Sequence, residues 1–488
     1  MKYYSVSISN NYNNTTLILS VVISIIVSVL VSINHKLFII FLGIIVLGIL
    51  IKSRKLYISV LLTIISMYLV LNQGITNVGV NITFLIPIGE IVLGIGLIRC
   101  ITNNLKVFFN RFKFPILIVF TYAITLMIYS FVKYGAIAFR DGVGFIEALY
   151  IFVTYSEFNM LSNRGIDIEN FIYRFIRIVL NTLFIYSLFY INSSILTNIS
   201  PIYKGYQKDI YLLGNFNSIH TWLLVLIIYN TSIVLSKNKN KIISRMLVHI
   251  QSIISLLLIL ITTSRVVIIL YFLFIVLFIL LKRMDIAKYL IAYVTMLGVV
   301  AFIIIGLGIK LKLRRGCLDI QFLKEFILSS VGKGSSGMSD GFYQRIYWNM
   351  NLIMESVKNN QVLTGRGFGI PLINFVDSQG YLVREPHNSY MSIYGRVGII
   401  ALLTWSVCMI RMLINSLKNF INYDNKISLL IVVFMIIGLF TGIVEPFFEL
   451  PYYTIVFYSL LGMLLYCEGD KIKKLRRVIK NEENNIYI

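Results

Sequence analysis

The hydrophobic positions of the chain fall into long runs that are separated by short polar segments, from about residue 16 to residue 467. Each run has roughly 16–23 residues, the length that crosses a bilayer as a helix, and we count about fourteen of them. Because a helix satisfies its own backbone groups in lipid, the pattern predicts an all-α, polytopic integral membrane protein with about 12–14 transmembrane helices.

The runs predict four regions: helices 1–11 within 1–309, a long connection over 310–395, helices 12–14 within 396–467, and a basic tail over 468–488. Four runs lie between residues 16 and 98, and the first two pairs could instead be short re-entrant hairpins. The later spans are expected at 114–132, 143–160, 175–195, 218–235, 246–261, 266–281, 287–309, 396–415, 427–444 and 451–467. The span at 143–160 is the weakest, because Glu147, Glu157 and Asn159 interrupt it.

Lysine and arginine in the short connections predict the orientation. If fourteen helices alternate, one side receives "KSRK" (52–55), residues 99–113, "KNKNK" (237–241), "KR" (282–283) and "KIKKLRR" (471–477). Basic connections favour the cytoplasmic side, so both termini are expected inside and residues 310–395 outside.

Composition supports this class of protein. The chain is 58% hydrophobic and only 13% charged, with a mean hydropathy of +0.84, more apolar surface than a soluble domain can bury. The net charge of +23 follows mostly from the basic connections and therefore predicts no nucleic-acid partner. The four cysteines are scattered without a CxxC pair, which indicates neither a metal site nor a disulfide framework.

Residues 310–395 form the one connection that is too long to be a simple loop, and such loops are usually functional or disordered. "DGFYQRIYWNMNLIMESVKNN" (340–360) places apolar residues at helical spacing, which predicts an amphipathic helix. "TGRGFGIP" (364–371) has the glycine spacing of a nucleotide loop, but no strand precedes it, so we interpret it as a tight turn.

Polar clusters mark several helix ends on the outer side. "YLVREPHNSYMSIYGRVGII" (381–400) holds one of the four histidines of the chain. An ionisable residue at the edge of a membrane span is a candidate functional group. The candidates are Arg384, Glu385 and His387 in this segment, Arg265 in "TTSRVV", Arg140 and Asp141 in "KYGAIAFRDG", and Lys204, Lys208, Asn217 and His220 in "YKGYQKDIYLLGNFNSIH".

Each candidate also has a structural interpretation. Arg140 and Arg265 could extend to the membrane interface. His387 could bond a loop backbone, and His220 could pack against Trp222 or cap its helix.

Taken in order, "LLGNFNSIHTWL", "TTSRVVIIL", "QRIYWNMNLIMESVKNNQVLTGRGFG" and "HNSYMSIYGRVGIIALL" resemble the motifs of the O-antigen ligase and O-unit (surface polysaccharide) polymerase superfamily. The resemblance covers about residues 205–465, whereas the first 200 residues are similar only in being helical. Two positions depart from the family: Tyr211 stands where an arginine is common, so Lys208 or Lys204 would substitute, and Met391 replaces a leucine.

The resemblance implies a GT-C-like glycosyltransferase of the bacterial cytoplasmic membrane that transfers sugars from polyprenyl diphosphate. Arg265, Arg140 and Lys208 would bind the diphosphate, because such a group needs several cations. His387 would be the catalytic base. Arg384, Asn388, Tyr390 and Arg345 would position the acceptor or the loop. No cofactor and no metal are expected.

The function expected from the resemblance is a polymerase that joins lipid-linked repeat units of an O-antigen or capsule by inverting transfer. Its partners would be the lipid-linked oligosaccharide, the bilayer, a flippase and a chain-length regulator. One alternative is a ligase that moves glycan to a lipid core or a protein. An alternative of another class is a flippase of lipid-linked oligosaccharide, although flippases favour two similar halves and no long outer loop.

Overall fold

The computed structural model describes most of the chain, and its contacts divide the chain into two units, residues 1–59 and 60–488. The described residues are 46–81, 85–111, 114–162, 167–204, 209–235, 242–308, 312–313, 316–317, 321–322, 324–325, 328, 336–376 and 382–486. In the first unit, residues 46–52 are helical and helix α3 (Arg54–Leu71) begins.

The second unit is mostly helical. After α3 and a short 3₁₀ turn, η1 (Asn72–Asn77), its first helices are α4 (Ile88–Arg111), α5 (Phe114–Tyr134), α6 (Ala136–Glu147), α7 (Tyr150–Ser162) and α8 (Ile168–Leu188). These are followed by η2 (Phe189–Asn192), α9 (Ser194–Asn198), α10 (Ile219–Val234), α11 (Ile242–Thr262), α12 (Arg265–Leu280) and α13 (Met284–Gly306). The last helices are α15 (Ser336–Lys358), α16 (Ser389–Tyr423), α17 (Lys426–Val444) and α18 (Pro451–Ile486).

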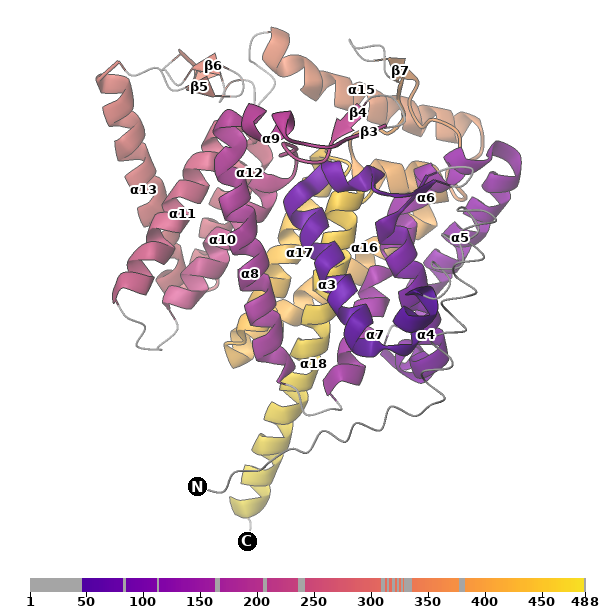
Figure 1. Cartoon of the computed structure of the whole chain (residues 1–488), viewed down its shortest axis with the longest axis horizontal. Coiled ribbons are helices and arrows are strands. Elements are labelled where there is room, and N and C mark those ends of the chain that lie inside the picture. The colour runs from indigo at the N-terminus through magenta and orange to yellow at the C-terminus, as the bar shows by residue number, and fades with distance from the viewer. Residues whose placement is uncertain are drawn as a thin grey trace, which may run out of the picture. The chain divides into compact units, whose positions relative to one another are not determined.

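Strands occur in the described residues only as short antiparallel hairpins. They pair β1 (Gly79–Asn81) with β2 (Leu85–Pro87), β3 (Ile202–Lys204) with β4 (Asp209–Tyr211), β5 (Lys312–Leu313) with β6 (Gly316–Cys317), and β7 (Phe375–Val376) with β8 (Leu382–Val383). Within residues 60–488, the hairpins β3–β4 and β5–β6 gather at the end of the bundle along which α15 runs, whereas the C-terminal part of α18 extends from the other end (Figure 1).

The expected class of fold, a multi-pass helical membrane protein, agrees with the helices observed. Six helical segments among the described residues are long and apolar enough to cross a bilayer, and three shorter apolar helices accompany them. The spans expected from residue 114 onward fall on α5, α8, α10, α11, α12, α13, α16, α17 and α18, with the exception of 143–160. The first two expected spans lie mainly outside the described residues.

Burial separates central helices from peripheral ones. In α10 every residue from Ile219 to Thr231 is buried, and most of α17 is buried as well. By contrast, α12 and α13 expose large apolar side chains, including Phe272, Leu280 and Phe302. A helix that is apolar on all sides belongs inside a bundle, and the exposed apolar faces of α12 and α13 match a lipid surface.

Four local features differ from the sequence prediction. The span expected at 143–160 is two helices, because α6 ends at Glu147 and α7 begins at Tyr150. Arg99, expected in a connection, lies inside α4, where its guanidinium meets the Glu157 carboxylate at 2.7 Å and both side chains are buried. Helix α16 begins at Ser389 rather than Arg396, and α18 continues through the basic tail to Ile486.

Candidate functional site

A cluster of buried charges lies where α6, the start of α16 and the segment 364–371 meet. The Asp141 carboxylate on α6 accepts hydrogen bonds from Arg384 Nε at 3.1 Å, Arg384 Nη2 at 2.7 Å and the backbone N–H of Gly369 at 3.0 Å. Arg396 Nη2 lies 3.1 Å from the same carboxylate. All three charged side chains are less than a tenth exposed, so their mutual pairing offsets the cost of removing them from water.

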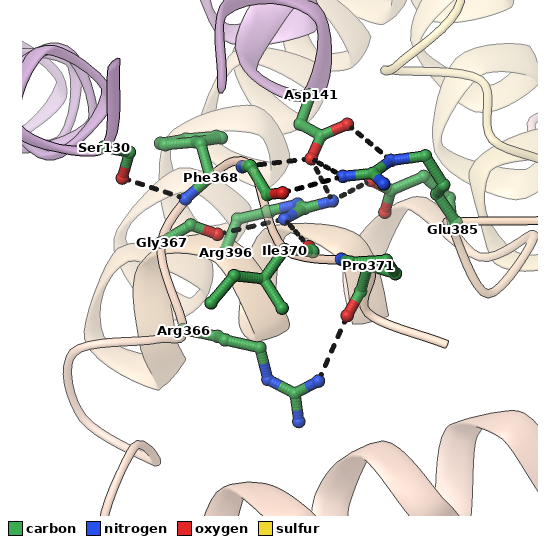
Figure 2. Close-up of polar contacts among 11 residues, drawn as sticks. Ser130, Asp141, Arg366, Gly367, Phe368, Ile370, Pro371, Glu385 and Arg396 are labelled. Atoms are coloured by element: carbon green, nitrogen blue, oxygen red, sulfur yellow. Dashed lines mark hydrogen bonds and ion pairs between the residues drawn. The ribbon is translucent and has the colours of Figure 1, made fainter. Parts of the chain in front are cut away.

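Arg396, on α16, bonds to two loop carbonyl groups and to a second carboxylate. Its guanidinium donates to the carbonyl oxygens of Gly367 and Ile370, at 3.0 and 2.6 Å, and to Glu385 Oε1 at 2.5 Å. Figure 2 shows Arg396 between Asp141 and Glu385, with the carbonyl groups of the 367–370 turn on its other side. The arginine therefore fixes the turn, α6 and the segment before α16 to one another.

The glycines of "TGRGFGIP" make this packing possible. Gly365, Gly367 and Gly369 have φ of +74°, +81° and +89°, which side chains rarely adopt. A Cβ at Gly365 would lie 2.4 Å from the Arg396 carbonyl oxygen. The segment is therefore a turn that docks on α16, as the sequence interpretation expected.

Helix α16 is broken at the level of this turn. Gly398 has φ 85° and ψ 174°, so the helical backbone is interrupted there. The freed backbone groups pair with the preceding segment: Arg366 N–H donates to the Gly395 carbonyl at 2.7 Å, and Ile399 N–H donates to the Val362 carbonyl at 2.9 Å. The turn thus completes the hydrogen bonding that the kink removes.

His387 occupies the turn that leads into α16, with φ 50°. Its ring stacks on Trp348 of α15, with ring centroids 5.8 Å apart and planes 28° apart. Burial, and then the positive charge of Arg345, lower the pKa of His387 to about 4. The imidazole is therefore neutral near pH 7 and able to accept a proton.

The other residues predicted to position the loop make defined contacts. The Asn388 side chain caps α16 by accepting from the N–H groups of Tyr390 and Met391, at 3.1 and 3.2 Å. The Tyr390 hydroxyl donates to the Leu439 carbonyl of α17 at 2.8 Å. Arg384 is committed to Asp141, which makes it part of the scaffold.

The cations predicted to bind diphosphate lie on separate elements. Arg265 is the first residue of α12 and stands two positions after Thr263, whose φ is 51°. Arg140 is exposed on α6, next to Asp141. Lys208 lies outside the described residues. Their convergence on one diphosphate remains a prediction, whereas His387, Arg345 and Trp348 are neighbours in the structure.

Sequence reasoning missed Arg396 and Glu449 as members of this region. Arg396 stands at the head of an apolar run, where an interfacial arginine is ordinary. Glu449 lies in "EPFFELP", between α17 and α18, and its carboxyl accepts from the Ser389 hydroxyl at 2.7 Å. Two carboxylates in so short a connection between apolar runs were the available signal.

No known protein family matches this sequence, and no curated protein is significantly similar to it. The fold and the buried charges therefore define a class only: a mostly helical, multi-pass membrane protein with a charged cluster at the start of α16.

Proposed function

We propose that the protein is a glycosyltransferase that joins polyprenyl-diphosphate-linked repeat units of a surface polysaccharide. The observation that carries this proposal is the packing of His387 against Trp348, beside Arg345. These residues come from two of the sequence segments on which the family resemblance rests, and they are far apart along the chain. Their proximity supports the interpretation that the segments serve one site.

His387 acts as the general base in this proposal. The neutral imidazole accepts the proton of an acceptor sugar hydroxyl while that oxygen attacks the anomeric carbon of the donor. The bond between this carbon and the diphosphate oxygen breaks, and its electron pair leaves with the diphosphate. Attack from the side opposite the leaving group inverts the configuration at carbon.

Binding of the donor strengthens this base. Arg345 is one cause of the low pKa of His387 in the free protein. A bound diphosphate brings negative charge, which offsets nearby arginine charges and favours the protonated imidazole. The pKa of His387 therefore rises when the donor is bound, toward the value that suits proton transfer near pH 7.

The test uses purified protein and a defined lipid-linked oligosaccharide, with polymer length and released polyprenyl diphosphate as readouts. His387→Ala and His387→Gln are expected to lower turnover by about 10²–10⁴, the usual worth of base catalysis. His249→Ala is the matched control, because His249 bonds the Tyr293 hydroxyl on α13 at 2.8 Å, away from α15 and α16. Turnover by His387→Ala at the wild-type rate would refute the proposal.

Analysis of the polysaccharide in a deletion strain separates the polymerase from the ligase. Loss of chain length with single repeat units still attached indicates a polymerase. Long chains that accumulate on the lipid carrier indicate a ligase. Accumulation of unpolymerised units on the cytoplasmic side indicates a flippase.

The proposed site requires α15 to face the outside of the cytoplasmic membrane, with both termini inside. Tyr347 on α15 is exposed, so a cysteine there is expected to react with an impermeant maleimide in intact cells. Reaction only after lysis would contradict this orientation.

A further inference from the structure

A small cavity lies beside the charged cluster, between α5, α6, α16 and the connection from α17 to α18. Its polar lining comprises Asp141, Glu385, Ser392, Arg396 and Glu449, and its aromatic walls include Trp405, Phe448 and Tyr458. None of the function proposed above uses Ser392 or Glu449. The cavity therefore places one hydroxyl and one carboxyl group without an assigned role in a mainly apolar enclosure.

Four polar atoms of this lining are buried and lack a hydrogen-bond partner within the described part of the chain: Arg396 Nε and three oxygen atoms. The three oxygen atoms are Glu385 Oε2, Ser392 Oγ and Glu449 Oε1. Ser392 as a whole is 2% exposed. A buried polar atom without a partner destabilises the fold, so three such oxygen atoms on one cavity point to a ligand that they share.

The second oxygen of each carboxyl group is already bonded. Glu385 Oε1 accepts a hydrogen bond from the Arg396 guanidinium at 2.5 Å. Burial raises the pKa of Glu385, and the positive charge of Arg396 opposes this rise. Glu449 Oε2 receives only a neutral donor, the Ser389 hydroxyl, at 2.7 Å. The two groups thus differ in kind: one carboxylate has a cationic partner and the other carboxyl has none among the described contacts.

The side chains that line the cavity with Glu449 come from several elements. The segment before α16 contributes Glu385, α6 contributes Asp141, α16 contributes Arg396, and α18 contributes Tyr458, while α5 contributes only Val119 and Phe120. Arg396 is shared between Asp141 and Glu385. Burial, and then the charge of Glu385, raise the pKa of Glu449 to about 8.

We propose that Glu385, Ser392 and Glu449 form a binding site for one exchangeable proton, which resides on Glu449 and fastens the turn that carries His387 to the α17–α18 connection. The proton comes from hydronium, which leaves as water when the Glu449 carboxylate becomes a carboxylic acid. The site is defined by the cavity and its contacts, and it stands whether or not the protein transfers sugars.

Ser389 links the start of α16 to the α17–α18 connection. Its hydroxyl donates toward Glu449 Oε2 and the Glu445 carbonyl, at 2.7 and 3.2 Å, and accepts the Phe448 N–H at 3.0 Å. When Glu449 loses its proton, it becomes the third carboxylate, after Asp141 and Glu385, on a cavity lined by one arginine. That arginine, Arg396, already pairs with the other two. The charges of Glu385 and Glu449 repel each other. The segment 385–389 is therefore held less firmly against the α17–α18 connection at high pH, and more firmly when Glu449 is protonated.

Trp405 reports on this proton directly, because its ring lines the cavity. The chain has three tryptophans, so Trp222→Phe/Trp348→Phe leaves Trp405 as the sole tryptophan. We expect its fluorescence to titrate with a midpoint near pH 8. Glu449→Gln should abolish the transition, and Glu385→Gln should move it to lower pH because the repelling charge is gone. Glu355→Gln, at an exposed carboxylate, should change nothing.

A flat Trp405 signal between about pH 6 and 10, or a transition that persists in Glu449→Gln, would overturn the proposal.

A second measurement uses the unaltered chain. Hydrophobic carbodiimides modify protonated carboxyl groups, and peptide mass spectrometry locates the adduct. Glu449 is expected to be modified at about pH 6 and spared at about pH 9.5, while exposed Glu355 is spared at both. Equal modification of Glu449 at both pH values, or none at pH 6, would contradict a site that holds an exchangeable proton.

Discussion

Asp141 offers the sharpest test of the charged cluster. Asp141→Asn keeps the size of the side chain and one oxygen for the Gly369 N–H, removes the negative charge, and replaces the other acceptor oxygen with an amide donor. Arg396 retains Glu385 and two carbonyl oxygens after the change. Arg384 loses both of its charge-assisted bonds to Asp141 and keeps the Gly369 carbonyl, at 3.1 Å.

The cost follows from burial. Arg384 is 9% exposed and Asp141 is 4% exposed, so water cannot replace the lost carboxylate. Breaking a buried pair by removing one partner costs about 3–5 kcal/mol. The matched control is Asp285→Asn, where Asp285 is 41% exposed and its partner Arg283 is 28% exposed. Pairs this exposed are worth about 0–1 kcal/mol.

The measurement is equilibrium unfolding in mixed micelles, with tryptophan fluorescence as the signal. Asp141→Asn should lower the free energy of unfolding by at least about 3 kcal/mol, and Asp285→Asn by under about 1 kcal/mol. Arg384→Met added to Asp141→Asn should recover most of the loss, because an apolar side chain of similar volume replaces the unpaired charge. Equal losses for Asp141→Asn and Asp285→Asn would refute the assignment of Asp141 as the centre of the cluster.

Three further outcomes are expected. kcat/KM falls as His387 becomes protonated, so the acid limb of its pH profile should lie near pH 4. Arg345→Gln should move this limb to higher pH, because the positive charge is lost, and Arg345→Lys should not. An unmoved limb in Arg345→Gln would show that the Arg345 charge does not lower the pKa of His387. Gly398→Ala should destabilise by more than the about 1–3 kcal/mol of backbone strain, since its Cβ would lie 2.0 Å from a carbonyl oxygen, whereas Gly94→Ala, with open space, should be tolerated. Arg265→Ala should abolish transfer without preventing membrane insertion, and Arg265→Lys should rescue it poorly, because an ammonium lacks the bidentate fork; full activity of Arg265→Ala would return this residue to an interfacial role.

The helices were predictable because the length of an apolar run is a local property. The runs at 427–444 and 266–281 correspond almost residue for residue to α17 and α12. Glu147 marked the span at 143–160 as the weakest, and α6 ends at that residue, but the sequence did not show that the chain divides there into two helices. There Gly144 packs so closely that a Cβ would lie 2.0 Å from the Phe448 carbonyl oxygen, and that contact depends on a segment far along the chain.

The site was predictable in its chemistry but not in its pairing. The polar residues of "REPHNSY" (384–390) indicated a functional segment before an apolar run. In the structure His387 of this segment lies beside Trp348 and Arg345. The partner of Arg384 is Asp141, 243 positions away in the sequence. No periodicity encodes such a distance. Arg384 was predicted to position the acceptor or the loop, and the sequence did not show that its partner is Asp141.

The segment from Val362 to Gly367, which hydrogen-bonds to α16 at the break, has a consequence for the order of folding. Backbone groups without a hydrogen-bond partner are costly in lipid, and the break at Gly398 opens such groups in the N-terminal part of α16. The segment that closes them, from Val362 to Gly367, precedes the helix in the chain, so the ribosome delivers the partner before the helix that requires it. The N-terminal part of α16 therefore completes its hydrogen bonds only by packing against a segment that was synthesised before it.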